Sequence, residues 1–247
     1  MATSLKPRQE DSITDVGLPS SPSLPPLENG DRLTRAEFER RFDAMPLVKK
    51  AELLEGVVYM PSPVRLRHHG IPHADVLTWL GVYRASTPGV ICADNTSARL
   101  DLDNEPQPDA LLMIEPHRGG QARISDDDNI EGAPELVVEV ASSSVSIDVH
   151  LKRHVYRRCG VREYVIWRVL DRQIDWLVLR DSEYVPLKPG AEGHYRSIVF
   201  PGLWLDSAAL LKGDISAVLE LLRHGLATAE HELFVQRLAV KLSTSTV

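Results

Sequence analysis

The sequence predicts an α/β protein in which a mixed β-sheet is flanked by helices. Two short apolar runs, 110–114 and 136–140, are bounded by proline and polar residues, a pattern typical of strands buried on both faces. Between residues 67 and 85 the apolar residues recur at helical spacing, which predicts an amphipathic helix. With 247 residues, 43% of them hydrophobic, the chain can bury a core of one domain of about 200 residues plus tails.

Composition limits which kinds of partner the protein can bind and in which cellular compartment it is expected. A net charge of -7 gives no general attraction for polyanions, so any contact with nucleic acid must be local or aided by a metal ion. Cys92 and Cys159 have no CxxC spacing and follow no secretory segment, which predicts reduced thiols. No apolar run approaches the roughly 20 residues that a membrane helix needs. We therefore expect a soluble, cytoplasmic protein without membrane contact.

The N-terminal third begins with a stretch that cannot form a core. Residues 1–30 hold five prolines and five serines with little apolar periodicity, so a disordered tail is expected. A helix is predicted to begin at Thr34 with a capping-box spacing to Glu37, and to end near Met45. The segment 51–60 then reads as a β-hairpin that turns at Glu55 and Gly56.

The remaining elements follow in order. After the helix at 67–85, residues 97–102 alternate as a strand, and the acidic run within the loop 116–134 is expected to be solvated. A second helix is predicted over 147–158, closed by Gly160. Further strands are predicted at 162–170 and 173–180 and near Tyr184 and Ile198, with helices from Leu205 onward. We divide the chain into a tail (1–30), a main domain (31–212) and a C-terminal helical extension (213–247).

Two acids mark the predicted buried strands. Asp109 lies at the start of the first, where it could also cap the strand end. Glu139 interrupts the second, and a buried carboxylate requires a cation, a proton or hydrogen-bond donors. Lys152 can supply that charge, because Asp148, Lys152 and Tyr156 share one face of the predicted helix. A structural ion pair of Glu139 with Lys152 or a neighbouring arginine is the alternative reading.

Seven features in a fixed order support a resemblance to a known family. They are ELLEG, VYMPSP, a histidine ahead of an amphipathic helix, QPD, PELVVEVASSS, D-x-x-x-K-x-x-x-Y and GVREYVIW. Over roughly Thr34 to Leu211 the chain resembles the Uma-type (Uma-two) family of predicted endonucleases, which belongs to the PD-(D/E)xK, or restriction-endonuclease-like, superfamily. The resemblance implies a restriction-endonuclease-like mixed sheet flanked by helices, here with additional hairpin strands and C-terminal helices.

The resemblance also implies a reaction and the residues that perform it. Such proteins hydrolyse phosphodiester bonds of nucleic acid, here expected to be DNA, with a divalent ion held by carboxylates and a lysine assisting the attacking water. Carried over residue by residue, the metal ligands are Glu52, Asp109 and Glu139, and hard oxygen ligands favour Mg²⁺ or Mn²⁺. The superfamily's usual lysine position is occupied by Ala141, and the family resemblance assigns that role to Lys152.

Other interpretations remain open at this point. The chain could be a nuclease-fold binding or assembly module without activity, or another metal-dependent hydrolase. Glu55 competes with Glu52 as the early acid, and the pairs His69/His73 and His150/His154 are expected to be exposed, with a separate case for His69 from the family pattern. The remaining expectations are a turn at Ser142–Ser144, a small basic patch at Arg153, Arg157 and Arg158, and a homodimer formed through apolar surface that includes Trp167, Trp176 and Trp204.

Overall fold

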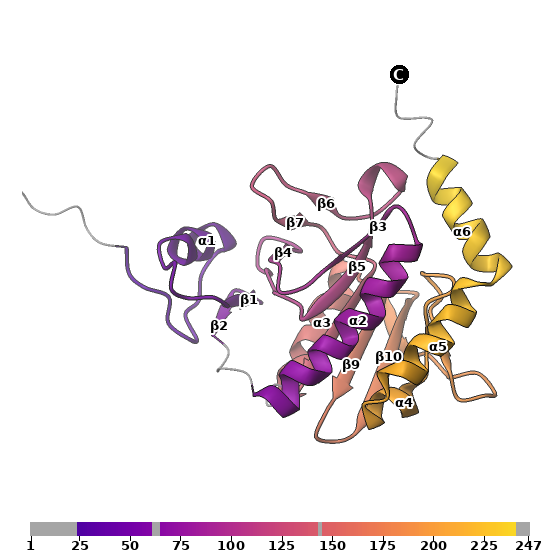
Figure 1. The fold of residues 1–247 in the computed structure, drawn as a ribbon. Coiled ribbons are helices and arrows are strands. Elements are labelled where there is room, and N and C mark those ends of the chain that lie inside the picture. The colour runs from indigo at the N-terminus through magenta and orange to yellow at the C-terminus, as the bar shows by residue number, and fades with distance from the viewer. Residues whose placement is uncertain (1–23, 61–64, 143–144, 241–247) are drawn as a thin grey trace, which may run out of the picture.

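A mixed six-stranded β-sheet forms the centre of the molecule (Figure 1). The computed structural model describes residues 24–60, 65–142 and 145–240. The strands are ordered β11-β10-β9-β8-β5-β3, and among them only β8 and β9 run parallel. Their bounds are β3 Val90–Ala93, β5 Ala110–Ile114, β8 Leu136–Ala141, β9 Glu163–Arg168, β10 Gln173–Arg180 and β11 Glu183–Pro186. The predicted fold class is confirmed.

Helices cover both faces of this sheet (Figure 1). One face packs against α2 and the C-terminal helices, whose buried residues include Trp79, Val218 and Phe234. The other face packs against the connection between β8 and β9. The bounds are α2 Ile71–Ser86, α4 Ser207–Lys212, α5 Ile215–Leu226 and α6 Ala229–Val240 on the first face, and η3 Ile147–Lys152 with α3 Arg153–Cys159 on the second.

Strand alternation decides where Glu139 points. In β8 the side chains of Leu136, Val138 and Val140 pack in the cluster around α2. Val137 and Ala141 pack in the opposite cluster, with Tyr156 of α3. Since side chains alternate along a strand, Glu139 lies on the α3 side. A single acid is thereby aimed at the helix that carries Lys152.

A smaller unit precedes the sheet in the chain and lies beside it (Figure 1). Helix α1, Arg35–Asp43, packs on the hairpin of β1, Glu52–Leu54, and β2, Val57–Tyr59, around buried Phe38 and Leu53. Leu53 exchanges backbone hydrogen bonds with Glu105, which ties the hairpin to the segment leading into β5. The remaining short elements are η1 Leu66–Gly70, β4 Ala98–Arg99, η2 Pro116–Arg118, β6 Arg123–Ile124, β7 Ile130–Glu131, β12 Tyr195–Arg196 and β13 Trp204–Leu205.

Several predicted boundaries differ from the structure. The strand expected at 97–102 is reduced to Ala98–Arg99. The chain turns directly after it, because the backbone N–H groups of Leu100 and Asp101 donate to the carbonyl of Asn104. No strand forms at Ile198, whose backbone N–H donates to buried Glu163 instead of to a neighbouring strand. Leu205 belongs to β13, and the helical segment begins after Asp206, whose carboxylate caps α4.

The chain ends also differ from their expected roles. Residues 1–23 of the expected tail lie outside the described residues, whereas Leu27 is 3% exposed and packs with Phe38 in the N-terminal core. In the helical extension, Val218, Leu222 and Phe234 belong to the same core cluster as the main sheet. Residues 24–30 and the C-terminal helices are therefore integral to the folded unit.

Two expectations about surfaces can be compared with burial. Trp167 and Trp176 are 5% and 1% exposed, so the apolar surface invoked for a homodimer is largely inside a single copy of the chain. In the described part of the chain, no helix has the length and apolar character needed to cross a membrane.

Candidate active site

Asp109 and Glu139 meet at one edge of the central sheet. Strand β5 pairs antiparallel with β8 so that Ala110 faces Val138, and one further step of this register sets Asp109 opposite Glu139. The backbone N–H of Val140 donates to Asp109 Oδ2 at 2.9 Å. Both carboxylates are buried, at 4% and 2% exposure. The two acids predicted from the strand ends thus lie side by side.

Glu52 and Lys152 complete this cluster from two other elements. The β1 hairpin places Glu52 Oε1 at 2.8 Å from Lys152 Nζ, and the same ammonium lies 2.9 Å from Glu139 Oε1. Tyr156 donates its hydroxyl hydrogen bond to that Glu139 oxygen at 2.8 Å, and Asp148 Oδ1 is 3.8 Å from Lys152 Nζ. The helix face predicted for these residues does point to Glu139. Side chains from the β1 hairpin, strand β8 and the helical segment η3–α3 therefore converge.

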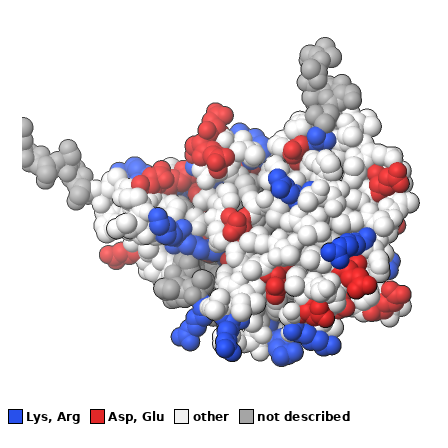
Figure 2. All heavy atoms as spheres, viewed as in Figure 1, with Lys and Arg blue, Asp and Glu red and all other residues white. Residues whose placement is uncertain are grey.

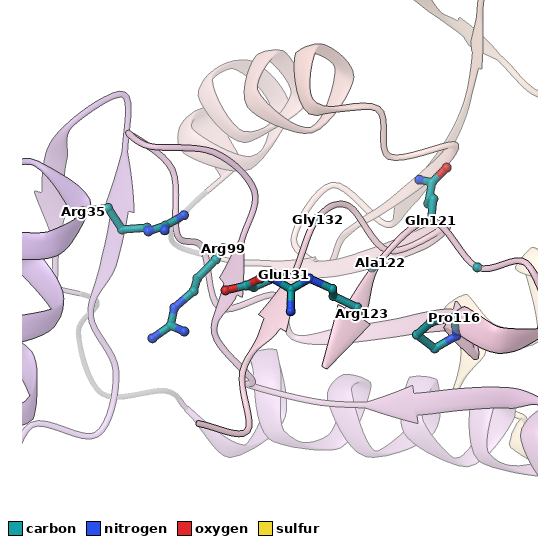
Figure 3. Close-up of a pocket in the computed structure, with 9 residues that line it drawn as sticks. Arg35, Arg99, Pro116, Gln121, Ala122, Arg123, Glu131 and Gly132 are labelled. Atoms are coloured by element: carbon teal, nitrogen blue, oxygen red, sulfur yellow. Dashed lines mark ion pairs between the residues drawn. The ribbon is translucent and has the colours of Figure 1, made fainter. Parts of the chain in front are cut away.

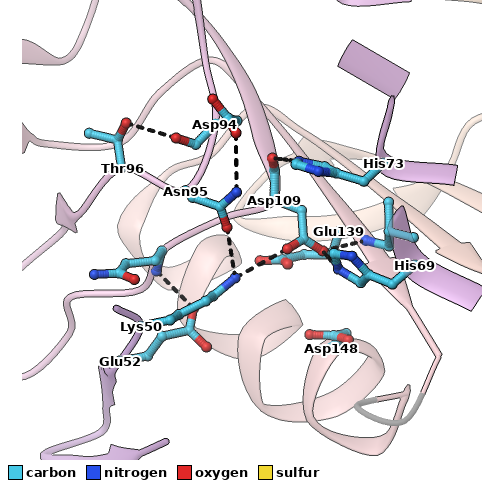
Figure 4. Close-up of polar contacts among 12 residues, drawn as sticks. Lys50, Glu52, His69, His73, Asp94, Asn95, Thr96, Asp109, Glu139 and Asp148 are labelled. Atoms are coloured by element: carbon cyan, nitrogen blue, oxygen red, sulfur yellow. Dashed lines mark hydrogen bonds and ion pairs between the residues drawn. The ribbon is translucent and has the colours of Figure 1, made fainter. Parts of the chain in front are cut away.

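Three side chains that surround Asp109 were not assigned to the site from the sequence (Figure 4). Lys50 Nζ lies 3.1 Å from Asp109 Oδ1, and His69 Nε2 lies 3.2 Å from Asp109 Oδ2. His73 Nε2 lies 2.6 Å from the backbone oxygen of Asp109. The available signal for Lys50 was its position two residues before Glu52, since alternate residues of an extended chain share a side. The signal for His69 was its place in the family pattern.

The expectation of exposed histidines is half wrong. His150 and His154 are exposed on η3 and α3. His69 has only 14% of its side chain exposed, because η1 and the first turn of α2 turn both His69 and His73 toward Asp109. These histidines act as partners of the acid, not as a pair of free imidazoles.

Crowding of charge sets the protonation of the cluster. Burial would raise the pKa of Asp109, but the His69 hydrogen bond and the charges of Lys50 and Lys152 hold it well below its usual range. Burial, aided by repulsion from Asp109 and other carboxylates, raises the pKa of Glu139 to about 8 despite the attraction of Lys152. Burial disfavours charge on Lys152, yet its acidic neighbours, Glu139 first, raise the pKa of its ammonium. The acids outnumber the cations that face them.

The competing candidates lie elsewhere or have other partners. Glu55 forms an ion pair of 3.0 Å with Arg158 and is not part of the cluster, so the hairpin contributes Glu52. In the expected basic patch, Arg158 also pairs with Asp101 at 2.9 Å, and Arg157 pairs with Glu183 at 3.0 Å. Acids thus offset two of its three arginines. Of the expected serine turn, Ser143 and Ser144 lie outside the described residues.

A separate open pocket of about 550 Å³ lies over the small sheet β4-β7-β6 (Figure 3). Its arginines are largely offset by acids: Arg99 lies 2.7 Å from both Glu39 and Asp127, and Arg123 pairs with Glu131. None of the residues that line it belongs to the carboxylate cluster. We therefore take the cluster around Asp109 and Glu139, and not this pocket, as the candidate active site.

The fold and the cluster define a class: a mixed α/β protein of the restriction-endonuclease-like type, with buried acids on adjacent strands and a lysine beside them. The family model described as "Uma2: Putative restriction endonuclease" matches residues 36–208, and the chain belongs to this family. Among solved structures, the chain is similar to that of a "putative nuclease belonging to DUF820" from Anabaena variabilis. That match has a TM-score of 0.52 and 14% identity, and covers 70% of this chain and 97% of the other. Among curated proteins, none matches the chain.

Proposed function

We propose that the protein is a metal-dependent endonuclease that hydrolyses phosphodiester bonds of nucleic acid. The observation that carries the proposal is the convergence of Glu52, Asp109, Glu139 and Lys152 at one sheet edge. Membership of a family of nucleases supports the reaction class. The metal, its ligands and the role of the lysine are the proposed part.

The donor set fits a divalent ion. Four carboxylates, those of Glu52, Asp109, Glu139 and Asp148, lie around the ammonium groups of Lys50 and Lys152. Hard carboxylate oxygens suit Mg²⁺ or Mn²⁺. Within the described residues, no three acid, histidine or cysteine side chains stand together as a ready coordination shell. Binding would thus require the lysines and carboxylates to rearrange locally.

Asp109 and Glu139, with Glu52, would hold the ion. Held there, a divalent ion would supply positive charge that lowers the pKa of an attacking water and offsets charge on the phosphoryl oxygens. Lys152 would orient that water or contact the phosphoryl group, since its ammonium already lies within 3 Å of both Glu52 and Glu139. Tyr156 would fix Glu139, and His69 would fix Asp109, through the hydrogen bonds that they make.

Nucleic acid would reach this edge through local cations, because the molecule as a whole is acidic. Figure 2 shows basic and acidic side chains interspersed over one face, with several basic side chains along the lower edge, where α2 begins. Exposed Arg65 directly precedes η1 and exposed Arg67 lies within it, and His69 of the same element contacts Asp109. Phosphate contacts at these arginines would place the backbone near the acids.

Cleavage of plasmid DNA and of single-stranded RNA in Mg²⁺ and in Mn²⁺ tests the proposal. Wild type should cut at least one of them, and Asp109→Ala and Glu139→Ala should each abolish cutting and weaken metal binding in calorimetry. Arg180→Ala, an exposed change in β10, should cut as wild type does. If no nucleic acid is cut with any divalent metal but DNA or RNA is bound, the proposal fails in favour of a binding module.

A further inference from the structure

The two oxygens of Asp109 have different kinds of partner (Figure 4). Oδ2 accepts the backbone N–H of Val140 at 2.9 Å and lies 3.2 Å from His69 Nε2. Oδ1 lies 3.1 Å from Lys50 Nζ. The Val140 amide is fixed within β8, so Oδ2 stays committed to the protein. Oδ1 is therefore the oxygen whose partner can leave.

Lys50 is placed to leave where Lys152 is not. Its side chain is 25% exposed and also bonds to Asn95 Oδ1 at 3.2 Å, at the exposed side of the cluster. Lys152 is 4% exposed and enclosed by Glu52 and Glu139. Moving the Lys50 ammonium into water costs little free energy, because part of its side chain is already exposed. Moving the Lys152 ammonium away would leave two buried acids without a cation.

We propose that Lys50 is a stand-in cation: it neutralises Asp109 in the metal-free protein and competes with the divalent ion for Asp109 Oδ1. The inference rests on the proposed role of Asp109 as a metal ligand. A carboxylate buried at 4% exposure needs a positive partner at all times, and Lys50 supplies one until the metal arrives. Asn95 keeps the displaced ammonium near the site. Lys50 is thus a positioning residue that sets how tightly the protein takes up metal.

The competition predicts that removing the ammonium tightens metal binding. In calorimetric titration with Mn²⁺, Lys50→Met should bind about tenfold more tightly than wild type, about 1.4 kcal/mol. Lys50→Gln, which keeps a hydrogen-bond donor without the charge, should shift in the same direction. The matched control is Lys49→Met, which deletes the same charge from an exposed neighbour whose ammonium donates to the Pro46 carbonyl at 3.0 Å. It should change the affinity less than twofold.

A second measurement uses the unaltered chain. A crystal structure of wild type with Mn²⁺ should show Lys50 Nζ withdrawn from Asp109 Oδ1 while His69 and the Val140 amide keep Oδ2. An intact Lys50–Asp109 pair beside bound metal would overturn the inference, as would equal or weaker binding in both Lys50 variants. If none of the proteins binds metal, the inference and the proposed function both fail. If the variants bind more tightly but wild type cuts no nucleic acid, only the proposed function fails.

Discussion

At the scale of single residues, Lys152 has two tasks that pull against each other. The sequence predicts that Lys152 supplies the charge that buried Glu139 needs, and the family resemblance gives it a role beside the attacking water. In the structure its ammonium lies between Glu52 and Glu139. A residue proposed to assist chemistry therefore also compensates buried charge. A loss of activity in a Lys152 variant can therefore come from either effect, and measuring the stability of the same variant separates the two.

We expect Lys152→Met to lower the free energy of unfolding by about 3 kcal/mol in metal-free buffer, because it leaves buried acids unpaired. Urea denaturation at pH 9, above the pKa of about 8 that burial gives Glu139, measures this loss with the carboxylate ionised. Adding Glu139→Gln should restore part of the loss, since the double variant no longer buries that charge. Both proteins should be inactive in the plasmid assay. A single variant as stable as wild type would show that Lys152 carries little of the compensation.

Glu105, which lies outside the candidate site, makes a pH-dependent contribution to folding stability. Burial, together with the neighbouring Glu39 carboxylate, raises the pKa of Glu105 to about 8 against the opposing charge of Arg99. In the unfolded chain this carboxyl releases its proton at about pH 4.3. Between those values the folded protein binds more protons, so this contribution is complete at low pH and is lost as pH rises toward 8.

Glu105→Gln should remove that dependence. Wild type should lose stability, relative to the variant, as the pH is raised from 5 to 8.5, by on the order of 4 kcal/mol. Urea unfolding at four pH values for both proteins provides the comparison. Parallel pH profiles for the two proteins would assign the ordinary pKa to Glu105.

At the scale of elements, η1 and the residue before it carry two exposed arginines proposed to bind phosphate, and His69 of η1 contacts Asp109. Changing both Arg65 and Arg67 to Ala should weaken DNA binding in Ca²⁺ and reduce its salt dependence by about two counterions, since each phosphate contact contributes about one. Fluorescence anisotropy over a range of salt measures both quantities. Arg180→Ala serves as the exposed control. An unchanged salt slope would place the phosphate contacts elsewhere.

Strands β5 and β8 could be predicted because each contains a short apolar run, with Asp109 directly ahead of one run and Glu139 inside the other. The sheet face on which Glu139 lies follows from strand alternation. The approach of Lys152 follows from the helix face that it shares with Asp148 and Tyr156. Lys50 and His73 could not be predicted, because their partners are set by how the β1 hairpin and α2 dock on the sheet edge. The short strand β3 was missed for a related reason: at the sheet edge its residues are only partly buried.

At the scale of the whole molecule, the folded unit is wider than the family match. Residues 36–208 exclude Leu27 at one end and Val218, Leu222 and Phe234 at the other, yet all four are buried. The C-terminal residues pack in the core cluster that also contains Trp79 of α2. Composition alone did not separate residues 24–30 from the preceding stretch, because one leucine among prolines and polar residues carries no periodicity.

This packing predicts how far the N-terminus can be shortened. A chain that begins at Leu24 should melt as the full chain does, whereas one that begins at Asp31 loses the buried Leu27 and the hydrogen bond from the Gly30 N–H to the Val58 carbonyl, 2.8 Å long. The loss of one buried leucine is worth about 2 kcal/mol, or roughly 4 to 8 °C in Tm for a chain of this size. Calorimetry of the two truncated proteins tests it. Leu27→Ala in the full chain should reproduce most of the drop, and equal melting of all four proteins would show that residues 24–30 add nothing to stability.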